Sequence, residues 1–392
     1  MSKTFSLGKP RNGTGLCLIA LENLREHGQT LAYNRARFHN HNDGRQEVWN
    51  VTSIRCVLLG FGAVARAFLD ILTKKEAHLK KQYGVRVLIT GAVTENHGRF
   101  LTDPGLGPEQ VMEEYRRAAG FTALPQFQGS ALDFIKSSSA DVAFEMTSLN
   151  HLSGQPAMDH VRTALQNGIH MISANKGPVA CGLKALKKLS RQTGRAFLYE
   201  TAVMDGAPVF NLVDRCLPGC TVTGFQGVLN STTNFVLDQL MEGSDVSSAL
   251  VIARDMGFAE ADPAADIEGW DSACKTAALM NAWMDADVTP CEIPRQGIEH
   301  VNSGRVAEAR GRGMRLRLIC RAAYKKDTPE GEVALVEVPV NSEMARVRGT
   351  TSLLRIRTDL MGDISIVEHE PRIEQSGYGL FSDLVRLLED NY

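Results

Sequence analysis

IRCVLLGFGAVARAFLDILTKK, residues 54–75, carries the pattern on which the fold prediction rests. Residues 54–59 are mainly apolar, as a strand buried on both faces requires, and apolar residues recur at helical spacing from Ala63 onward. Between them, Gly60 allows a tight turn, and Gly62 lets a pyrophosphate approach the backbone beside the free N–H groups of the helix N-terminus. The pattern predicts a dinucleotide-binding unit. A glycine turn in an α/β protein that binds no nucleotide is the alternative.

The alternation of strands and helices continues beyond this stretch. A helix is predicted over residues 155–167 and another after Pro178. Apolar or alternating patterns predict strands at VRVLITGAV (85–93), DVAFEM (141–146), GIHMIS (168–173), MRLRLICRAAY (314–324), GEVALVEVPV (331–340) and TSLLRIRTDL (351–360). The chain is therefore predicted to be an α/β protein.

Composition and charge are those of a soluble globular protein. A length of 392 residues exceeds what one hydrophobic core usually holds, so two or three domains are expected. Lys and Arg number 43 against 45 Asp and Glu, which favours neither nucleic acid nor an acidic membrane as a partner. The eight cysteines include no CxxC pair, so a reducing cytoplasm fits better than a zinc or disulfide framework. No apolar run approaches the roughly 20 residues that cross a bilayer.

The residues after the second predicted strand bear on the choice of cofactor. In a Rossmann domain, an acidic residue at this place binds the adenosine ribose of NAD, whereas a basic residue accommodates the 2′-phosphate of NADP. Glu95 favours NAD and Arg99 favours NADP, so the sequence leaves both open. A solvated loop charge is the alternative for Glu95.

The segment GFAEADPAADIEGWDSACK (257–275) is a second candidate for a functional site. Asp271 and Lys275 are four residues apart and lie on one face of a predicted helix, where they can present an acid and a base to one small substrate. Lys176, just after a predicted strand, is a further candidate to reach a cofactor or substrate. A surface ion pair is the alternative for Asp271 with Lys275, and a surface loop lysine is the alternative for Lys176.

Five motifs in a fixed order are more specific than the glycine turn. They are EMTSLN (145–150), ANKGPVA (174–180), YETAVMDGAPVF (199–210), GVLNSTTNFVL (227–237) and the 257–275 segment. Their order and spacing resemble homoserine dehydrogenases. The resemblance implies an NAD(P)-binding Rossmann domain, an α+β catalytic and dimerisation domain with a mostly antiparallel sheet, and a homodimer. It also implies interconversion of L-homoserine and L-aspartate 4-semialdehyde by hydride transfer, within threonine and methionine biosynthesis.

The resemblance assigns roles to the matching residues. It implies that Lys275, Asp271 and Lys176 are catalytic and that Glu260, Asp271 and Lys275 bind the substrate, with Glu260 holding its amino group. A proton donor or cation is needed beside the carbonyl oxygen, because hydride transfer to an aldehyde builds negative charge there. NAD or NADP would be held by Gly60, Gly62, Ala63, Val64, Thr147, Ser148 and Lys176. A sodium or potassium ion would be held, mainly through backbone carbonyls, at Glu200, Val203, Asp205 and Ala207.

The chain departs from the family near its C-terminus. Members carry a GPGAG-like loop that closes over the nicotinamide and the substrate, whereas residues 368–372 are EHEPR here. The change predicts an altered pocket in which His369, Glu370 or Arg372 can contact a substrate carboxylate; a rebuilt surface loop is the alternative. It leaves open a bulkier alcohol or aldehyde as substrate, or a nucleotide-binding paralogue without turnover.

The predicted organisation has four parts. Residues 1–50 form an N-terminal extension, 51–177 the Rossmann domain, 178–365 the catalytic and dimerisation domain, and 366–392 a loop and helix returning to the nucleotide domain. No regulatory ACT domain is expected after residue 300. The polar residues of NSTTN (230–234) can cap the following helix, donate to a ligand, or do both. Trp270 is predicted to pack at a domain or dimer seam.

Overall fold

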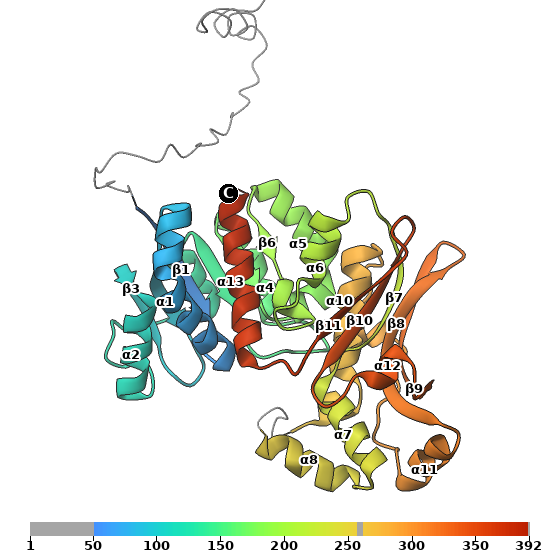
Figure 1. Cartoon of the computed structure of the whole chain (residues 1–392). Helices are drawn as coiled ribbons and strands as arrows, with labels where there is room; N and C mark the ends of the chain where they lie inside the picture. The colour runs from blue at the N-terminus through green and yellow to red at the C-terminus, as the bar shows by residue number, and fades with distance from the viewer. Residues whose placement is uncertain (1–50, 257–261, 391–392) are drawn as a thin grey trace, which may run out of the picture. The chain divides into compact units, whose positions relative to one another are not determined.

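A computed structural model describes residues 51–256 and 262–390 of the chain. Within these residues the strands form two sheets, which Figure 1 shows with their helices. The predicted N-terminal extension and Glu260 lie outside the described residues. In the described ranges, no helix combines the length and apolar character needed to cross a membrane.

The first sheet contains the predicted nucleotide-binding unit. Its strand order is β3-β2-β1-β4-β5-β6, and every pairing is parallel except that of β2 with β3. The bounds of its strands are β1 Thr52–Leu59, β2 Val85–Val93, β3 Arg99–Leu106, β4 Val142–Glu145, β5 His170–Ser173 and β6 Phe197–Leu198. From β1 the strand order runs outward through β2 to β3, and from β4 it runs outward the other way through β5 to β6. This reversal of strand order between β1 and β4 is typical of a Rossmann sheet. Because β6 belongs to it, the sheet extends beyond residue 177.

Helices cover both faces of this sheet. Buried residues of α1, α2 and α13 share one core with the strands, and those of α3, α4 and α5 pack in the other. The bounds are α1 Ala63–Tyr83, α2 Pro108–Ala118, α3 Ala131–Ser137, α4 Ala157–Gln166, α5 Gly177–Thr193 and α13 Ile373–Glu389. Such cover explains why β4 and β5 are buried along their whole length.

The second sheet is antiparallel throughout, with the order β11-β10-β7-β8-β9. Its strands are β7 Val222–Val228, β8 Met314–Lys325, β9 Thr328–Pro339, β10 Ser352–Thr358 and β11 Asp363–Glu368. The helices of this part are α6 Val209–Asn211, α7 Ser231–Glu242, α8 Val246–Asp255, α9 Ala264–Ile267, α10 Trp270–Trp283, α11 Ser303–Gly311 and α12 Glu343–Arg346. Short helical turns occur at η1 Glu200–Ala202, η2 Leu212–Cys216 and η3 Pro290–Glu292. The predicted fold class is confirmed by the two sheets.

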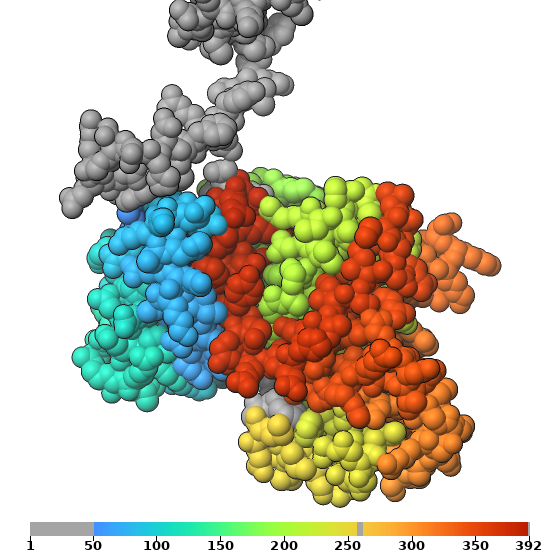
Figure 2. Space-filling view, in the orientation of Figure 1, coloured from blue at the N-terminus to red at the C-terminus, as the bar shows by residue number. Residues whose placement is uncertain are grey.

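The C-terminal helix α13 packs against α1, at the opposite end of the described sequence (Figures 1 and 2). Leu380 and Leu384 are fully buried in the core that also holds Phe68 and Leu72 of α1. The C-terminal helix therefore shares a core with the first sheet. As a result, the segment between β11 and α13 links the two sheets.

Candidate active site

Three elements, β5, α5 and α10, bring the predicted catalytic residues together. Lys176 precedes α5 at its N-cap position, just after β5, and Asp271 lies in the first turn of α10 with Lys275 one turn later. Helices α5 and α10 pack side by side, and Asn281 of α10 donates to the carbonyls of Val179 and Ala180 in α5 at 3.2 and 3.1 Å. This packing sets Lys176 opposite Asp271.

The three residues form one ion cluster. Lys176 Nζ lies 2.5 Å from Asp271 Oδ1, and Lys275 Nζ lies 3.3 Å from Asp271 Oδ2. The side chains are 20%, 15% and 13% exposed for Lys176, Lys275 and Asp271, so the pair is not the surface ion pair considered as the alternative. Lys275 also donates to the carbonyl of Leu229 at 2.5 Å. The predicted placement of Asp271 and Lys275 on one helix face is confirmed.

The contacts between Asp271 and Lys176 shift the pKa values of both residues in the direction that favours their charged forms. Burial alone would raise the pKa of Asp271, but Lys176 and then Lys275 hold it well below the usual range of a carboxyl. Burial would lower the pKa of Lys176, and the contact with Asp271 instead raises it above that of a free lysine. The site therefore presents a carboxylate between two ammonium groups, a suitable environment for an oxygen on which negative charge develops.

Asp266 is a member of this neighbourhood that the sequence analysis missed. Asn230 Nδ2 donates to Asp266 Oδ1 at 2.7 Å and to Asp271 Oδ2 at 2.9 Å, so one amide joins both carboxyls. Burial, followed by the charge of Asp271, raises the pKa of Asp266. The only signal in the sequence was a second aspartate five residues before Asp271. Asn230 also caps α7, as predicted, because its side chain accepts from the N–H of Thr233.

The glycine turn after β1 fits a dinucleotide. Gly60 has φ of +93°, and a Cβ there would lie 2.6 Å from the carbonyl oxygen of Met146. A Cβ on Gly62 would meet nothing within 4 Å, so open space lies over the N-terminus of α1. The first turn of α1, which begins with Ala63 and Val64, contains no acidic residue. Free N–H groups and the positive end of the helix dipole are thus available to phosphates.

The segment after β4 is held by hydrogen bonds within the protein. The N–H of Thr147 donates to Glu145 Oε1 at 2.8 Å, and its hydroxyl donates to the same oxygen. Asn175 Nδ2 donates to the carbonyls of Thr147 and Ser148 at 3.0 and 3.3 Å. The hydroxyl proton of Thr147 is therefore used internally, and the segment lies against the residue that precedes Lys176.

The residues bearing on cofactor choice have different environments. Glu95 is exposed, whereas the Arg99 guanidinium donates to the carbonyl of Gly129. Thr94 closes the loop between them, since its hydroxyl donates to the carbonyl of Gly98 at 2.8 Å.

In the predicted cation loop, two side chains are already engaged. The carboxylate of Glu200 accepts from the N–H groups of Phe210 and Asn211 at 2.7 and 2.9 Å, and Asp205 accepts from the Ser376 hydroxyl at 2.6 Å. Any cation here would therefore rely on carbonyl oxygens, as the resemblance implies. In the described part of the chain, no group of three or more His, Cys, Asp or Glu residues is arranged to hold a metal ion.

The 368–372 loop brings a carboxyl into this region. Glu368 ends β11, and its Oε2 is buried without a hydrogen-bond partner. Burial and then the charge of Asp205 raise the pKa of Glu368 to about 7, against the opposing effects of the Gly206 N–H and Lys275. Glu370 adopts φ of +45°, and the backbone N–H of Arg372 donates to Gln375 at the start of α13. The charge of Lys275 therefore acts on Glu368 of this loop. Contact of His369, Glu370 or Arg372 with a substrate carboxylate stays a prediction.

Trp270 joins the nucleotide-binding part to α10. Its ring stacks on that of His151 with centroids 4.7 Å apart, and the Arg295 guanidinium lies 3.4 Å from its centroid. His151 follows the Thr147–Ser148 segment, so the stack lies beside the ion cluster. The predicted packing role of Trp270 agrees with this position.

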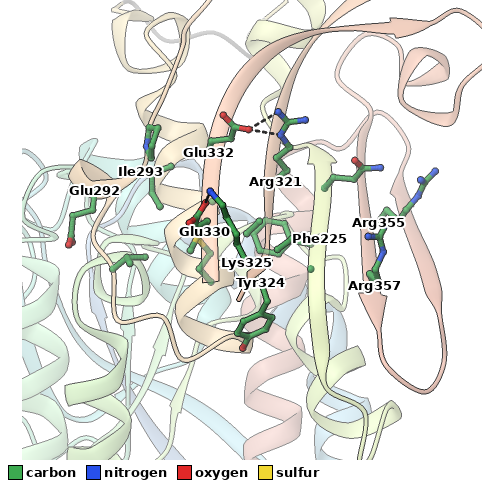
Figure 3. A pocket seen from close by; sticks show the side chains of 18 residues that line it. Phe225, Glu292, Ile293, Arg321, Tyr324, Lys325, Glu330, Glu332, Arg355 and Arg357 are labelled. Carbon is green, nitrogen blue, oxygen red and sulfur yellow. Dashed lines mark hydrogen bonds and ion pairs between the residues drawn. The ribbon is translucent and has the colours of Figure 1, made fainter. Parts of the chain in front are cut away.

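A separate hollow lies away from the ion cluster. It has a volume of about 610 Å³ and opens on the second sheet, and Arg321 and Glu332 pair within it at 2.6 Å (Figure 3). Tyr324 and Lys325 of β8 and Arg355 and Arg357 of β10 also line it. None of the ion-cluster residues lines it, so its role is separate from that of the cluster.

Several known proteins are similar to this chain in sequence. Residues 208–385 match the family model of homoserine dehydrogenase. An NAD(+)-dependent homoserine dehydrogenase from Pseudomonas canavaninivorans is 32% identical over 346 residues, which cover 86% of this chain and 97% of that protein. This chain belongs to the homoserine dehydrogenase family. A second member of the family, from Methanocaldococcus jannaschii, is 30% identical and is covered over 97% of its length.

Solved structures of the family show the same fold. The homoserine dehydrogenase of Thermoplasma acidophilum superimposes with a TM-score of 0.74 at 19% identity, covering 86% of this chain and 100% of that one. A hyperthermophilic archaeal homoserine dehydrogenase in complex with NADPH gives a TM-score of 0.73 at 20% identity and covers 87% of this chain and 99% of that one. Membership of the family and its two-sheet fold, both predicted from the motifs, are confirmed.

Proposed function

We propose that this protein interconverts L-homoserine and L-aspartate 4-semialdehyde with NAD or NADP. The observation that carries the proposal is the buried cluster of Lys176, Asp271 and Lys275 at the carboxyl edge of a Rossmann sheet. A continuous series of contacts joins it to the glycine turn, because Gly60 packs on Met146, and Asn175 binds the next residues and precedes Lys176.

The side chains of the cluster suit the reacting oxygen. The nicotinamide cofactor, when bound, supplies or accepts the hydride. Lys275 and Lys176 then stabilise the negative charge on the substrate oxygen and hold the proton that it takes up during reduction. Asp271 fixes both ammonium groups, so their orientation is set before the substrate arrives.

Substrate and cofactor contacts follow from the same arrangement. We propose that Asp271 and Lys275 bind the substrate together with Glu260, with Asp266 added next to Asn230. The cofactor phosphates would lie over Gly60, Gly62, Ala63 and Val64, and the segment of Thr147 and Ser148 would face the ribose and nicotinamide beside Lys176. Binding to Thr147 would use its backbone and the lone pairs of its hydroxyl, since the hydroxyl proton is donated to Glu145.

We also propose a monovalent cation in the 200–207 loop. The carbonyls of Glu200, Val203, Asp205 and Ala207 would hold it, because the carboxylates of Glu200 and Asp205 are engaged within the protein. Addition of KCl in place of choline chloride should then raise activity at constant ionic strength. Equal activity in both salts would contradict this cation site.

We propose that the exposed face of the second sheet forms a homodimer. The hollow in Figure 3 carries Arg355 and Arg357 on one side and Arg321, Glu330 and Glu332 on the other, a mixture of charges that can complement itself across a twofold axis. Light scattering should give twice the chain mass, and Arg357→Glu should shift the protein toward the monomer. A monomeric wild-type protein would contradict the dimer.

The proposed domain limits are those predicted, with β6 and α13 added to the nucleotide-binding part. A cytoplasmic location is proposed because the seven cysteines of the described residues are all free thiols, as a reducing compartment maintains them.

The proposed activity is tested by absorbance at 340 nm with L-homoserine and each nicotinamide cofactor. Turnover of homoserine in preference to larger amino alcohols is expected. Strong preference for a bulkier alcohol, or nucleotide binding with no turnover of any substrate, would replace the proposal with one of its two alternatives.

A further inference from the structure

Glu145 is a buried carboxylate that the proposed hydride transfer does not use. It ends β4 in the middle of the parallel sheet and is 0% exposed. Its Oε2 lies 2.6 Å from Nδ1 of His160, which is 3% exposed, and its Oε1 accepts both the N–H and the hydroxyl of Thr147. With Glu145 ionised, all three of these groups act as donors to it.

A carboxylate is costly at this position. The other residues of β4 are Val142, Ala143 and Phe144, and all three are apolar and buried. Strand pairing needs no charge here, and burying an ion costs several kcal/mol unless its partners compensate. The partners of Glu145 therefore indicate what the charge holds in place. They are one residue of α4 and the turn formed by residues 146–148.

This turn contacts the phosphate-binding turn on one side. The N–H of Met146 donates to the carbonyl of Leu59 at 2.8 Å. A Cβ on Gly60 would lie 2.6 Å from the carbonyl oxygen of Met146 and 3.1 Å from the N of Thr147. The two turns are thus in backbone contact, and a shift of the 146–148 turn would displace Gly60.

On its other side, the turn contacts the residue before Lys176. Asn175 Nδ2 donates to the carbonyls of Thr147 and Ser148, and its Oδ1 accepts from the N–H of Gly177 at 2.9 Å. Lys176 lies between these two anchored residues. The position of the lysine is therefore tied to the turn that Glu145 holds.

We propose that Glu145, held by His160, is a positioning residue that keeps the nucleotide-binding turn and the Lys176 loop in register. Its effect on Lys176 rests on the proposed dehydrogenase function, whereas its effect on nucleotide binding does not. The role uses a carboxylate, because an amide of the same shape would either direct its N–H₂ group toward the two Thr147 donors or require His160 Nδ1 to change from donor to acceptor.

Glu145→Gln tests this role, and Asp141→Asn is its matched control. Asp141 precedes the same strand at the opposite edge of the sheet, where its carboxylate accepts from Arg55 at 2.8 and 2.9 Å. Glu145→Gln should weaken binding of NADH or NADPH, measured by fluorescence titration, by at least about tenfold, because buried donors lose their charged partner and the turn that packs on Gly60 shifts. Asp141→Asn should leave binding within about twofold.

The two readouts separate this inference from the proposed function. If homoserine is turned over, Glu145→Gln should also lower kcat at saturating nucleotide by about 10- to 100-fold, a loss that weaker nucleotide binding alone does not produce. If homoserine is not turned over, the loss of nucleotide binding still supports the positioning role. Nucleotide binding at the wild-type level, or an equal loss in Asp141→Asn, would overturn it.

His160→Gln provides a second variant should Glu145→Gln fail to fold. It leaves the contacts of Glu145 with Thr147 and removes only the imidazole donor, so the same loss of nucleotide binding is expected at several-fold rather than tenfold size. Because the proposal has His160 hold the carboxylate, unchanged binding in a folded His160→Gln protein would overturn it even if Glu145→Gln does not fold.

Discussion

Two buried clusters of charge in this protein differ in what surrounds their carboxyls. Asp271 has a lysine on each side, whereas a neighbour of Asp383 is another acidic residue, Glu200, whose backbone N–H donates to Asp383 Oδ2 at 2.8 Å. All three are largely removed from water. Burial raises the pKa of Asp383 to about 8 and that of Glu200 to about 7, and for Asp383 the nearby Glu200 adds to the effect. For Asp271, the lysines reverse the effect of burial.

The difference shows that neighbours, more than burial, decide whether a buried carboxyl is charged. Asp271 stays a carboxylate across the neutral pH range and can orient its two lysines for chemistry. The Asp383 and Glu200 pair gains protons near neutrality and links α13 to η1, so it contributes a pH-dependent element of stability.

The largest effect is expected when the charge of Asp271, which lies between the two lysines, is removed. Asp271→Asn leaves two buried ammonium groups without their carboxylate, so homoserine turnover should fall by at least about 100-fold. The control is Asp285→Asn, since Asp285 pairs with Lys184 at the surface and its side chain is 82% exposed. A steady-state assay at 340 nm in which the two variants behave alike would contradict the role of Asp271.

Asp383→Asn tests the second cluster, in which burial and the charge of Glu200 raise the pKa of Asp383. A raised folded pKa means that the folded state binds this proton more tightly than the unfolded chain, so the contribution of Asp383 to stability falls as pH rises from about 4 through about 8. The change in the free energy of unfolding caused by Asp383→Asn should therefore be more favourable at pH 8.5 than at pH 5.5, by about 1 to 3 kcal/mol. Thermal unfolding at both pH values measures this, and an equal effect at both would be contrary to it.

Asn230→Ala should loosen the Asp271 cluster without removing a charge. The variant loses the cap of α7, worth about 1 kcal/mol, and the amide that joins Asp266 to Asp271. Asn302→Ala removes a similar cap, because Asn302 accepts from the N–H of Arg305 at the start of α11, away from the cluster. Both should lose similar stability in urea unfolding, but only Asn230→Ala should lose activity.

The smallest effect is expected at Glu368. The pKa of its carboxyl is about 7, and the charge of Lys275 acts on it. Glu368→Gln should therefore change the pH dependence of kcat/KM between pH 6 and pH 8, with a difference from the wild type of less than about tenfold at any pH in this range. Glu370→Gln is the control, because Glu370 is exposed in the same loop. Superimposable pH profiles for the wild type and Glu368→Gln would exclude Glu368 from the electrostatics of the site.

Local patterns in the sequence predicted much of this architecture. The run at 85–93 matches the bounds of β2, and the spacing of Asp271 and Lys275 placed them on one helix face because helix geometry depends on near neighbours. The contact of Lys176 with Asp271 joins residues 95 positions apart, so it depended on the packing of α5 on α10. No spacing rule showed that packing, and only the family motifs indicated a shared role.

The residues that the sequence analysis missed share this dependence on distant partners. Glu145 and Asp266 look like ordinary strand-end and loop carboxylates until His160 and Asn230 are brought against them. The orientation of Glu200 toward the N–H groups of Phe210 and Asn211 was likewise set by a turn whose path the sequence does not specify.

The most direct test of the catalytic cluster is homoserine oxidation by Lys275→Ala beside Lys184→Ala, followed at 340 nm together with nucleotide affinity. Lys184 lies on α5 with its side chain 56% exposed and pairs only with surface aspartates among the described residues. Lys275→Ala should lower kcat by at least about 100-fold and leave the nucleotide Kd within about twofold, while Lys184→Ala should match the wild type. A Lys275→Ala enzyme as active as Lys184→Ala would contradict the account.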